Sequence, residues 1–403
     1  MVFTQEQEDI INQGVDWFKN SSEQVFEICG EAGTGKSVVL YEIIRRLGLS
    51  TFQYLPMAYT GQASIVMRLK GFPHSRSIHS TLYEYTEHYK DYNPYANTKF
   101  NAPVKERTFS LKSRDALGPV ILFVFDESFQ IPLQMRKDIE SFGIKCLVAG
   151  DDGQLPPVYG EPAYLTGYGV HRLTQLMRQA EGSPIIYIAR RARRGLPIHC
   201  GIYGYNALVI EDRDLNPELM RLSNAIVCGT NVTRDIINRY VRESILDIHS
   251  DLPVFGDRMI CRNNNWNIER DGISLANGLV GTVVNSPNVS GFDGKTFKID
   301  FAPDLCHTVF DEVEVDYEYY KAPYTRRKDI KFNRFNKGED FEYAYALTTH
   351  LTQGAEFNTG MYVEEFLRPN IQNQLNYTGI TRFKQFLIYV KKSKNFSVYF
   401  GQN

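Results

Sequence analysis

The sequence predicts an α/β protein with at least two domains. The chain has 403 residues, 43% of them hydrophobic, which exceeds the length at which a single hydrophobic core usually stops growing. Short apolar runs that end in polar residues suit the strands of a parallel sheet covered on both faces. A glycine-rich loop joins one such run to the start of an apolar helix. Strand, glycine loop and helix follow one another in this order in α/β nucleotide-binding domains.

The first predicted domain begins with a helix. Thr4, followed three residues later by Gln7, matches a capping box, and Ile10, Ile11 and Val15 then recur at helical spacing. Buried strands are expected over residues 25–29, 52–58, 120–125 and 145–149. Turn formers and weak periodicity between residues 83 and 117 predict an insertion that projects from the sheet.

The second half of the chain starts a new α/β segment after about residue 179. It contains an expected strand over 225–228 and an amphipathic helix from 232 to about 245. The signals then become β-like, with strand patterns and turn clusters over residues 280–284, 296–301 and 313–317. This predicts a small barrel inserted in the second domain. The α/β pattern returns with expected strands over residues 344–348, 360–363 and 386–390.

Composition excludes several other classes of protein. The longest apolar stretch, Val120–Phe125, is too short to cross a bilayer, and the acidic, polar first ten residues do not match a signal peptide. Six cysteines without a Cys-x-x-Cys pair argue against a zinc site and for reduced thiols. We therefore expect a cytoplasmic protein that is not attached to a membrane.

The net charge of −2 does not by itself indicate a nucleic-acid partner, but the sequence contains two local clusters of basic residues. Each could be a solvated face or could line a nucleic-acid cleft. The first consists of Arg190, Arg191, Arg193 and Arg194. The second surrounds Tyr324, Phe332 and Phe335 and consists of Arg326, Arg327, Lys328, Lys331, Arg334 and Lys337.

The glycine-rich loop matches the complete pattern G-x-x-x-x-G-K-[ST]. Its backbone N–H groups can surround phosphates, Lys36 can neutralise the outer phosphates, and the Ser37 hydroxyl can bind Mg²⁺. The alternative is a glycine turn without a nucleotide, which the setting between strand and helix disfavours. The predicted nucleotide-binding residues are Gly30, Ala32, Gly33, Thr34, Gly35, Lys36 and Ser37.

Two adjacent carboxylates, Asp126 and Glu127, end the most apolar predicted strand. Asp126 can hold Mg²⁺, and Glu127 can orient and deprotonate an attacking water. Asp126 could instead be only the N-cap of a following helix. Together with the loop, the pair predicts an NTPase that uses Mg²⁺.

With these motifs identified, the chain resembles the superfamily 1B DNA helicases of the RecD-like and phage Dda-like type. The similar segments run in family order along almost the whole chain. They are residues 3–7 (Q motif), 58–63 (motif Ia), 77–80 (a short T-x-H/I-H-S element), 150–158 (motif III), 173–178 (motif IV), 344–357 (motif V) and 377–382 (motif VI).

The resemblance implies a monomer with two RecA-like domains that hold ATP between them. It implies domain 1A over residues 1–82 and 118–178, and an inserted 1B or pin element over 83–117. Domain 2A would comprise 179–260 and 343–403, with an SH3-like 2B barrel inserted over 261–342.

The resemblance also implies roles for residues in the matching segments. Gln7 would read adenine, unless it serves only the capping box, and Gln154 would sense the γ-phosphate, although Pro156-Pro157 could mark a simple turn. Arg178 and Arg382 would be arginine fingers, or else ordinary salt-bridge residues. Gly354 and Glu356 would approach the nucleotide, Glu356 at its ribose. The implied nucleic-acid contacts are Thr60, Asn231, Thr348, His350 and His79, the last of which could instead be a hydrogen-bonded core histidine.

Two positions depart from the family pattern. Motif Ia has Tyr59 where the family usually has proline, and Phe383-Lys384 follow Arg382 where a small residue is usual. Neither change removes a charged catalytic group, but Tyr59 alters the expected groove.

The resemblance implies an ATP-dependent 5′–3′ DNA helicase of replication, recombination or repair. It would act on single-stranded and forked duplex DNA, with replication or recombination proteins as further partners, in the host cytoplasm if phage-encoded. Candidates for separating the strands are Tyr92, Tyr95 and Phe100, which could equally be core aromatics. The alternatives are an RNA helicase or other nucleic-acid-stimulated NTPase, a P-loop kinase, and a non-catalytic nucleic-acid-binding module.

Overall fold

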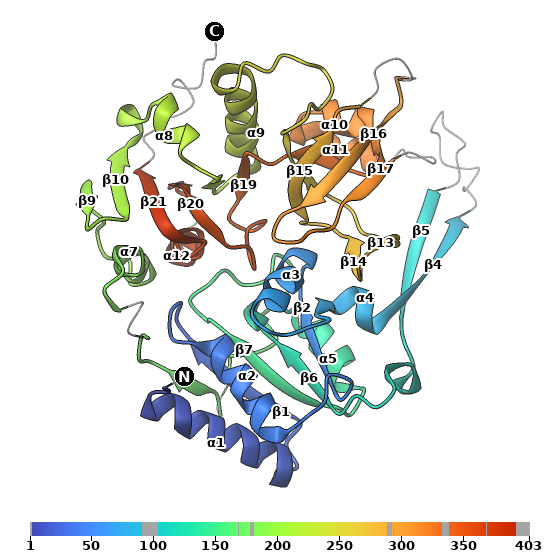
Figure 1. Ribbon diagram of the computed structural model, residues 1–403, viewed down its shortest axis with the longest axis vertical. Coiled ribbons are helices and arrows are strands. Elements are labelled where there is room, and N and C mark those ends of the chain that lie inside the picture. Colours follow the sequence, from blue (N-terminus) through green and yellow to red (C-terminus); the bar gives the residue numbers. More distant parts are fainter. Residues whose placement is uncertain are drawn as a thin grey trace.

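A computed structural model describes residues 2–90, 104–167, 169–177, 181–287, 292, 294–332, 338–367 and 369–391. Two six-stranded sheets and one five-stranded sheet organise these residues. In Figure 1 the N-terminal sheet lies below, the second α/β sheet at the upper left and the inserted β sheet at the upper right. None of the helices that the structure describes has the length and apolar character needed to cross a membrane.

The first sheet has six parallel strands in the order β3-β2-β6-β7-β1-β8. They are β1 (Val25–Gly30), β2 (Tyr54–Ala58), β3 (Arg76–Ser77), β6 (Leu122–Phe125), β7 (Lys145–Gly150) and β8 (His171–Leu173). Its helices are α1 (Gln5–Asn20), α2 (Lys36–Leu47), α3 (Gly61–Leu69), α4 (Ile78–Leu82) and α5 (Leu133–Glu140), with short 3-10 turns at Arg114–Leu117 and Ser128–Gln130.

Both faces of this sheet are buried, as the apolar runs predict. Along β6, Leu122 and Val124 pack into one core cluster, whereas Phe123 and Phe125 pack into another. Successive side chains of a strand point to opposite faces, so a strand between two cores must be apolar at every position.

The predicted capping box at the start of α1 is confirmed. The Thr4 hydroxyl accepts the Gln7 backbone N–H at 3.2 Å, and Gln7 Oε1 accepts the Thr4 N–H at 3.1 Å. Two N–H groups that the helix cannot satisfy itself are therefore paired.

The second sheet has the order β19-β11-β20-β21-β10-β9, parallel except for β9 against β10. Its strands are β9 (Gly201–Tyr203), β10 (Ala207–Glu211), β11 (Ala225–Cys228), β19 (Ala346–Thr348), β20 (Phe357–Val363) and β21 (Phe383–Lys391). Its helices are α7 (Pro184–Arg193), α8 (Pro217–Arg221), α9 (Asn231–Tyr240) and α12 (Gln372–Ile380), with a 3-10 turn at Asp212–Asp214 and a π-helical turn at Val241–Ile245. The predicted return to α/β structure after the insertion is confirmed.

The inserted β region contains an antiparallel sheet with the order β17-β16-β15-β12-β18. Its strands are β12 (Arg258–Cys261), β15 (Val280–Asn285), β16 (Thr296–Pro303), β17 (Phe310–Asp316) and β18 (Phe341–Tyr343); it also holds the hairpin β13 (Asn265–Arg270)–β14 (Ile273–Leu275) and the helices α10 (Tyr317–Lys321) and α11 (Tyr324–Phe332). This sheet starts at Arg258, before the boundary predicted at residue 261. Glu339, just before β18, bridges to Val315 of β17 at the opposite edge. The SH3-like designation stays a prediction.

The projecting insertion is an antiparallel hairpin. Strands β4 (Tyr83–Lys90) and β5 (Val104–Leu111) pair from Tyr83–Leu111 to Lys90–Val104. Sequence analysis placed the insertion here but foresaw no strands. Figure 1 shows the hairpin extending past β13 and β14, and the rings of Phe109 and Trp266 lie 5.7 Å apart. The predicted strand-separating residues Tyr92, Tyr95 and Phe100 lie outside the described residues.

Candidate active site and nucleic-acid interface

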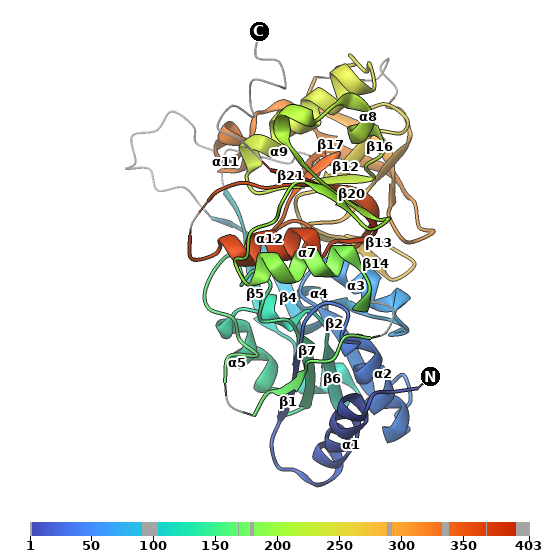
Figure 2. The same cartoon turned by 90° about the vertical axis from the view of Figure 1, so that its left-hand side faces the viewer.

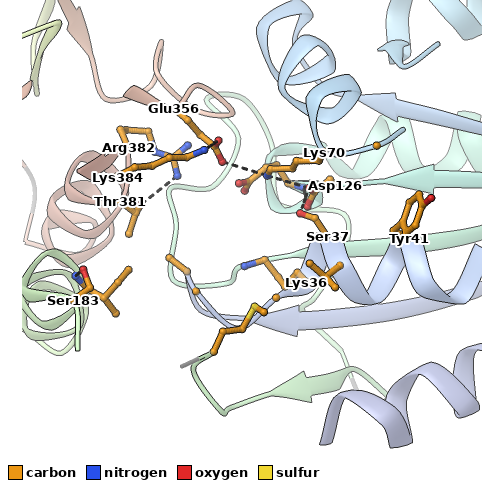
Figure 3. A pocket seen from close by; sticks show the side chains of 18 of the residues that line it. Lys36, Ser37, Tyr41, Lys70, Asp126, Ser183, Glu356, Thr381, Arg382 and Lys384 are labelled. Carbon is orange, nitrogen blue, oxygen red and sulfur yellow. Dashed lines mark hydrogen bonds and ion pairs between the residues drawn. The ribbon is translucent and has the colours of Figure 1, made fainter. Parts of the chain in front are cut away.

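A cavity of about 920 Å³ lies between the two α/β parts of the molecule. Figure 3 shows Lys36, Ser37 and Asp126 on one side of it and Glu356, Arg382 and Lys384 on the other. The predicted site residues that line the cavity are Ala32, Gly33, Gly35, Lys36, Ser37, Asp126, Glu127, Gln154, Glu356 and Arg382. Gln7, Gly30, Thr34 and Gly354 are not among its lining residues. Arg178 lies outside the part of the chain that the structure describes.

The loop between β1 and α2 has the backbone conformation that its glycines permit. Gly33 and Gly35 have φ of 86° and 84°, in the left-handed region, and a Cβ on Gly35 would lie 2.6 Å from Gln7 Nε2. The loop ends at the N-terminus of the 12-residue helix α2, whose first N–H groups can bind an anion. The Lys36 ammonium donates to the carbonyls of Gly30 and Glu31 at 2.8 and 3.1 Å.

Asp126, at the end of β6, meets the start of α2. Its Oδ2 accepts the Ser37 hydroxyl at 2.7 Å and lies 3.5 Å from Lys70 Nζ. Burial alone would raise the pKa of Asp126, but the ammonium of Lys70 and the hydrogen bond from Ser37 lower it below its ordinary value. A carboxylate and a hydroxyl this close inside a phosphate-sized cavity fit Mg²⁺, which takes one or two protein oxygens together with phosphates and waters.

Glu127 and Gln154 form a pair in the same cavity. Gln154 Nε2 donates to Glu127 Oε2 at 2.9 Å. Both side chains line the cavity. Glu127 has φ of 52°, an uncommon conformation for a residue with a side chain. Gln154 Oε1 is buried and has no hydrogen-bond partner among the described residues. An acceptor oxygen beside a carboxylate suits a bound water, which donates two hydrogen bonds.

Two lysines hold Glu356 in the loop before β20. Lys70 Nζ lies 3.3 Å from Glu356 Oε1, and Lys384 forms an ion pair with Glu356 Oε2 (Figure 3). Burial would raise the pKa of Glu356, yet these neighbours lower it. Burial would likewise lower the pKa of Lys70, but Asp126 and Glu356 raise it above its ordinary value. Lys384, a departure from the family pattern, is thus part of the cavity.

Arg382 is 3% exposed and lines the cavity from the second α/β part. Its guanidinium donates to the carbonyls of Thr378 at 3.0 Å and Ala355 at 3.2 Å. No carboxylate is paired with it among the described residues, so the ordinary salt-bridge alternative is not what the structure shows. Its role as an arginine finger stays a prediction.

Gln7 uses both ends of its side-chain amide inside the protein. Besides the capping-box contact of Oε1, Nε2 donates to the Thr34 carbonyl at 3.0 Å. The capping-box interpretation is therefore confirmed, and Gln7 additionally supports the loop from behind. Reading of adenine by Gln7 stays a prediction.

An ionic network, which sequence analysis did not foresee, connects α7 to the first domain. Arg193 donates at 2.6 Å to both Asp151 and Asp152, and its guanidinium lies over the Tyr377 ring. The Tyr377 hydroxyl contacts Asp151 and accepts the Ala32 N–H of the phosphate loop. Arg190 pairs with Glu31 at 2.8 Å. Two arginines of the first basic cluster are thus neither a purely solvated face nor free for nucleic acid.

The predicted nucleic-acid residues lie at the carboxyl ends of neighbouring parallel strands. Thr60 follows β2 and His79 follows β3, while Asn231 follows β11 and Thr348 ends β19. The strands β3 and β2 lie at one end of the first sheet, and β19 and β11 lie at one end of the second. Figure 2 shows the two α/β parts one above the other. The carboxyl ends of parallel strands are where open α/β sheets place their ligand-binding loops.

Several of these residues already have partners. The Thr60 hydroxyl caps α3 by accepting the Ala63 N–H at 3.1 Å, and the Thr348 hydroxyl accepts the Leu351 N–H at 3.4 Å. His79 stacks on Tyr83 with ring centroids 5.6 Å apart. Burial lowers the pKa of His79 and of His350, so both are neutral at pH 7. Neutral histidines would contact a nucleic acid by stacking or hydrogen bonding rather than by charge.

Comparison with known proteins identifies the family. The family described as AAA domain matches residues 3–208, about half of the chain. The chain belongs to the AAA domain family. For this AAA-domain protein, solved structures then show the fold beyond the matched residues.

Three Pif1 helicase structures are similar to this AAA-domain protein. Two coordinating Pif1 helicases at forked dsDNA give 18% identity and a TM-score of 0.56, covering 96% of this chain and 92% of that one. Bacteroides Pif1 with ADP-AlF3 and ssDNA has 18% identity and a TM-score of 0.55, and the match covers 96% of this chain and 92% of that one. Candida albicans Pif1 has 15% identity and a TM-score of 0.52, and the match covers 99% of this chain and 98% of that one. The family match and these likenesses support the resemblance to superfamily 1B helicases and show that the chain shares the fold of the Pif1 helicase structures.

Proposed function

We propose that the protein is an ATP-dependent DNA helicase that moves along single-stranded DNA from 5′ to 3′ and unwinds forked duplexes. One observation carries the proposal: the Asp126–Ser37 pair of the first α/β part and Arg382 of the second line a single cavity. Hydrolysis at such a cavity depends on how the two parts sit against each other, so turnover can be coupled to their movement.

The residues of the cavity divide the work of hydrolysis. Lys36 and the N–H groups of the loop bind phosphates, and Ser37 with Asp126 would hold Mg²⁺, which supplies charge neutralisation at the phosphates. Glu127 takes a proton from the attacking water, and Gln154 positions Glu127 and that water. Arg382 turns from its backbone carbonyls toward the transferring phosphoryl group.

Support for a DNA substrate comes from the solved relatives. Similar Pif1 structures contain ssDNA, forked dsDNA and ADP-AlF3. In the proposed arrangement, residues 1–82 and 118–178 form domain 1A and residues 179–260 and 343–403 domain 2A. The DNA crosses the edges β3-β2 and β19-β11, and the barrel-like insertion acts as domain 2B.

Strand displacement tests the proposal. Forked DNA with a 5′ tail should be unwound in the presence of ATP and Mg²⁺, whereas a fork with only a 3′ tail should not. Lys36→Ala should abolish both unwinding and ATP hydrolysis without lowering the melting temperature, while Lys19→Ala at the exposed end of α1 should behave like the wild type. Unwinding from the 3′ tail would contradict the polarity, and stronger stimulation of ATPase by RNA would favour the RNA helicase alternative.

A further inference from the structure

Lys70 lines the cavity but belongs to none of the motifs that the sequence analysis identified. It caps the C-terminus of α3, and its backbone N–H donates to the carbonyls of Val66 and Met67 at 3.1 and 3.2 Å. Gly71 follows with φ of 95° and ends the helix. The helix end therefore fixes the backbone position of Lys70, and its side chain extends into the cavity (Figure 3).

The Lys70 ammonium competes for the oxygen that a metal would use. It lies 3.5 Å from Asp126 Oδ2, the same atom that accepts the Ser37 hydroxyl. Asp126 is 5% exposed, and a buried carboxylate requires a counter-charge. Lys70 is a counter-charge in contact with this carboxylate, whereas the Lys36 ammonium donates to the carbonyls of Gly30 and Glu31.

The same ammonium also contacts the second α/β part. Lys70 Nζ lies 3.3 Å from Glu356, which is paired on its other side with Lys384. Asp126, Lys70, Glu356 and Lys384 thus form an alternating row of charges across the cavity. Lys70 is the member of this row that touches one carboxylate from each α/β part.

We propose that Lys70 is an additional residue of the nucleotide site, which neutralises Asp126 when Mg²⁺ is absent and turns to phosphate oxygens when a nucleotide enters. The inference rests on the proposed function, because it assumes that the cavity binds nucleotide. Two cations cannot share Asp126 Oδ2 without repulsion, so binding of the magnesium nucleotide displaces the ammonium. Lys70 therefore makes the site less dependent on the metal.

The test is nucleotide affinity rather than turnover. A fluorescent ADP analogue is titrated into the full chain with Mg²⁺ and, separately, with EDTA. The Kd with EDTA is divided by the Kd with Mg²⁺, and this EDTA-to-Mg²⁺ ratio is compared between the wild type and each variant. Lys70→Met should weaken metal-free binding and raise the EDTA-to-Mg²⁺ ratio about tenfold, the size expected for one charge-assisted contact. Binding with Mg²⁺ should change much less, because the lost phosphate contact is offset by relief of the repulsion between the two cations at Asp126. Lys70→Arg keeps a cation and should keep the wild-type ratio.

Lys384→Met is the matched control, because Lys384 lines the same cavity and pairs with Glu356 but does not contact Asp126. It should leave the ratio unchanged. Lys70→Gln, checked like the others by melting temperature, should repeat the result of Lys70→Met if the methionine variant does not fold. An unchanged ratio in the Lys70 variants, or an equal rise in Lys384→Met, overturns the inference alone. Wild-type protein that binds neither form overturns the proposed function as well.

Discussion

Asp126 and Glu127 are neighbours in the chain but have different surroundings. Asp126 faces the hydroxyl of Ser37 and the ammonium of Lys70, whereas Glu127 accepts a hydrogen bond from the Gln154 amide. The first environment favours the ionised form of the carboxylate, which suits a metal ligand. The second places a carboxylate beside an amide oxygen that has no hydrogen-bond partner in the described part of the chain, which suits a residue that binds and deprotonates water.

Replacing Glu127 by glutamine should separate binding from hydrolysis. The amide cannot take a proton, so we expect turnover to fall by about 10²-fold or more while binding of ATP and single-stranded DNA is retained. Steady-state ATPase and equilibrium binding measure the two effects. Glu161→Gln, an exposed glutamate outside the cavity, is the control. Normal turnover of Glu127→Gln would show that another residue activates the water.

At the scale of elements, helix α7 connects the two α/β parts through Arg193. The guanidinium lies where a side chain at position 153 would be, since a Cβ on Gly153 would come within 2.3 Å of it. Arg193 thereby fixes the segment that ends in Gln154, two residues after Asp152. It is a positioning residue and does not itself line the cavity.

Loss of Arg193 should weaken the link between the domains and spare nucleotide binding. We expect Arg193→Gln to lower DNA-stimulated turnover about tenfold, the cost of charge-assisted hydrogen bonds, with little change in ADP affinity. Arg191→Gln on the same helix is the control, because the Arg191 side chain donates to the Tyr187 hydroxyl and the Pro197 carbonyl, which lie outside this network. Equal kcat for the two variants would contradict the positioning role.

A buried cluster joins α9 to the inserted β region. Glu342 of β18 lies 2.7 Å from Arg234 of α9 and 3.4 Å from both Arg262 and Arg327. Burial would raise the pKa of Glu342, but the three arginines lower it from 4.5 to about 2. Because the folded-state pKa lies below the unfolded one, the stabilisation is complete above about pH 4.5 and is lost as the pH falls toward 2.

Glu342→Gln should therefore destabilise the protein most near neutral pH. We expect a loss of about 3 kcal/mol at pH 7, which corresponds to the shift in pKa and to the loss of the carboxylate that the three arginines share. Urea unfolding at a series of pH values should show the difference from wild type shrinking below pH 4.5. Glu312→Gln, whose partner Lys298 is exposed, is the control. A difference that does not vary with pH would refute the electrostatic cause.

At the scale of the whole molecule, the β4–β5 hairpin lies against the inserted β region. Phe109 of β5 meets both His79 of α4 and Trp266 of β13, with ring centroids 6.5 and 5.7 Å apart. The hairpin is therefore braced between the first domain and the insertion. Under the proposed function, this bracing would hold β4 and β5 in place as the two α/β parts move.

Removing the brace should uncouple unwinding from ATP hydrolysis. Phe109→Ala should keep DNA-stimulated ATPase and lose several-fold in unwinding rate, because aromatic pairs contribute beyond simple burial. Phe255→Ala, at an exposed ring elsewhere, serves as the control. The same assay applies to alanine variants of Tyr92, Tyr95 and Phe100. Parallel loss of both activities in Phe109→Ala would mean that the ring supports the fold rather than strand separation.

The sequence by itself determined the features whose partners are close in the chain or whose pattern is periodic. The capping box of Thr4 and Gln7, the phosphate loop and the strands of both α/β parts follow from spacing, glycine positions and apolar runs, since local geometry fixes them. The order of the motifs also indicated the family. The sequence pattern also predicted where the inserted sheet lies, although its first strand starts at Arg258, three residues before the expected boundary at residue 261.

Tertiary structure alone decided the contacts between distant segments. Lys70 meets Asp126 across 56 positions, Arg193 meets Asp151 across 42, and Glu356 meets Lys384 only because motifs V and VI fold together. A lysine at a helix end or an arginine in a basic run has the same local pattern whether it is solvated or paired. The choice depends on which carboxylates the fold brings within reach, and burial then makes that pairing energetically necessary.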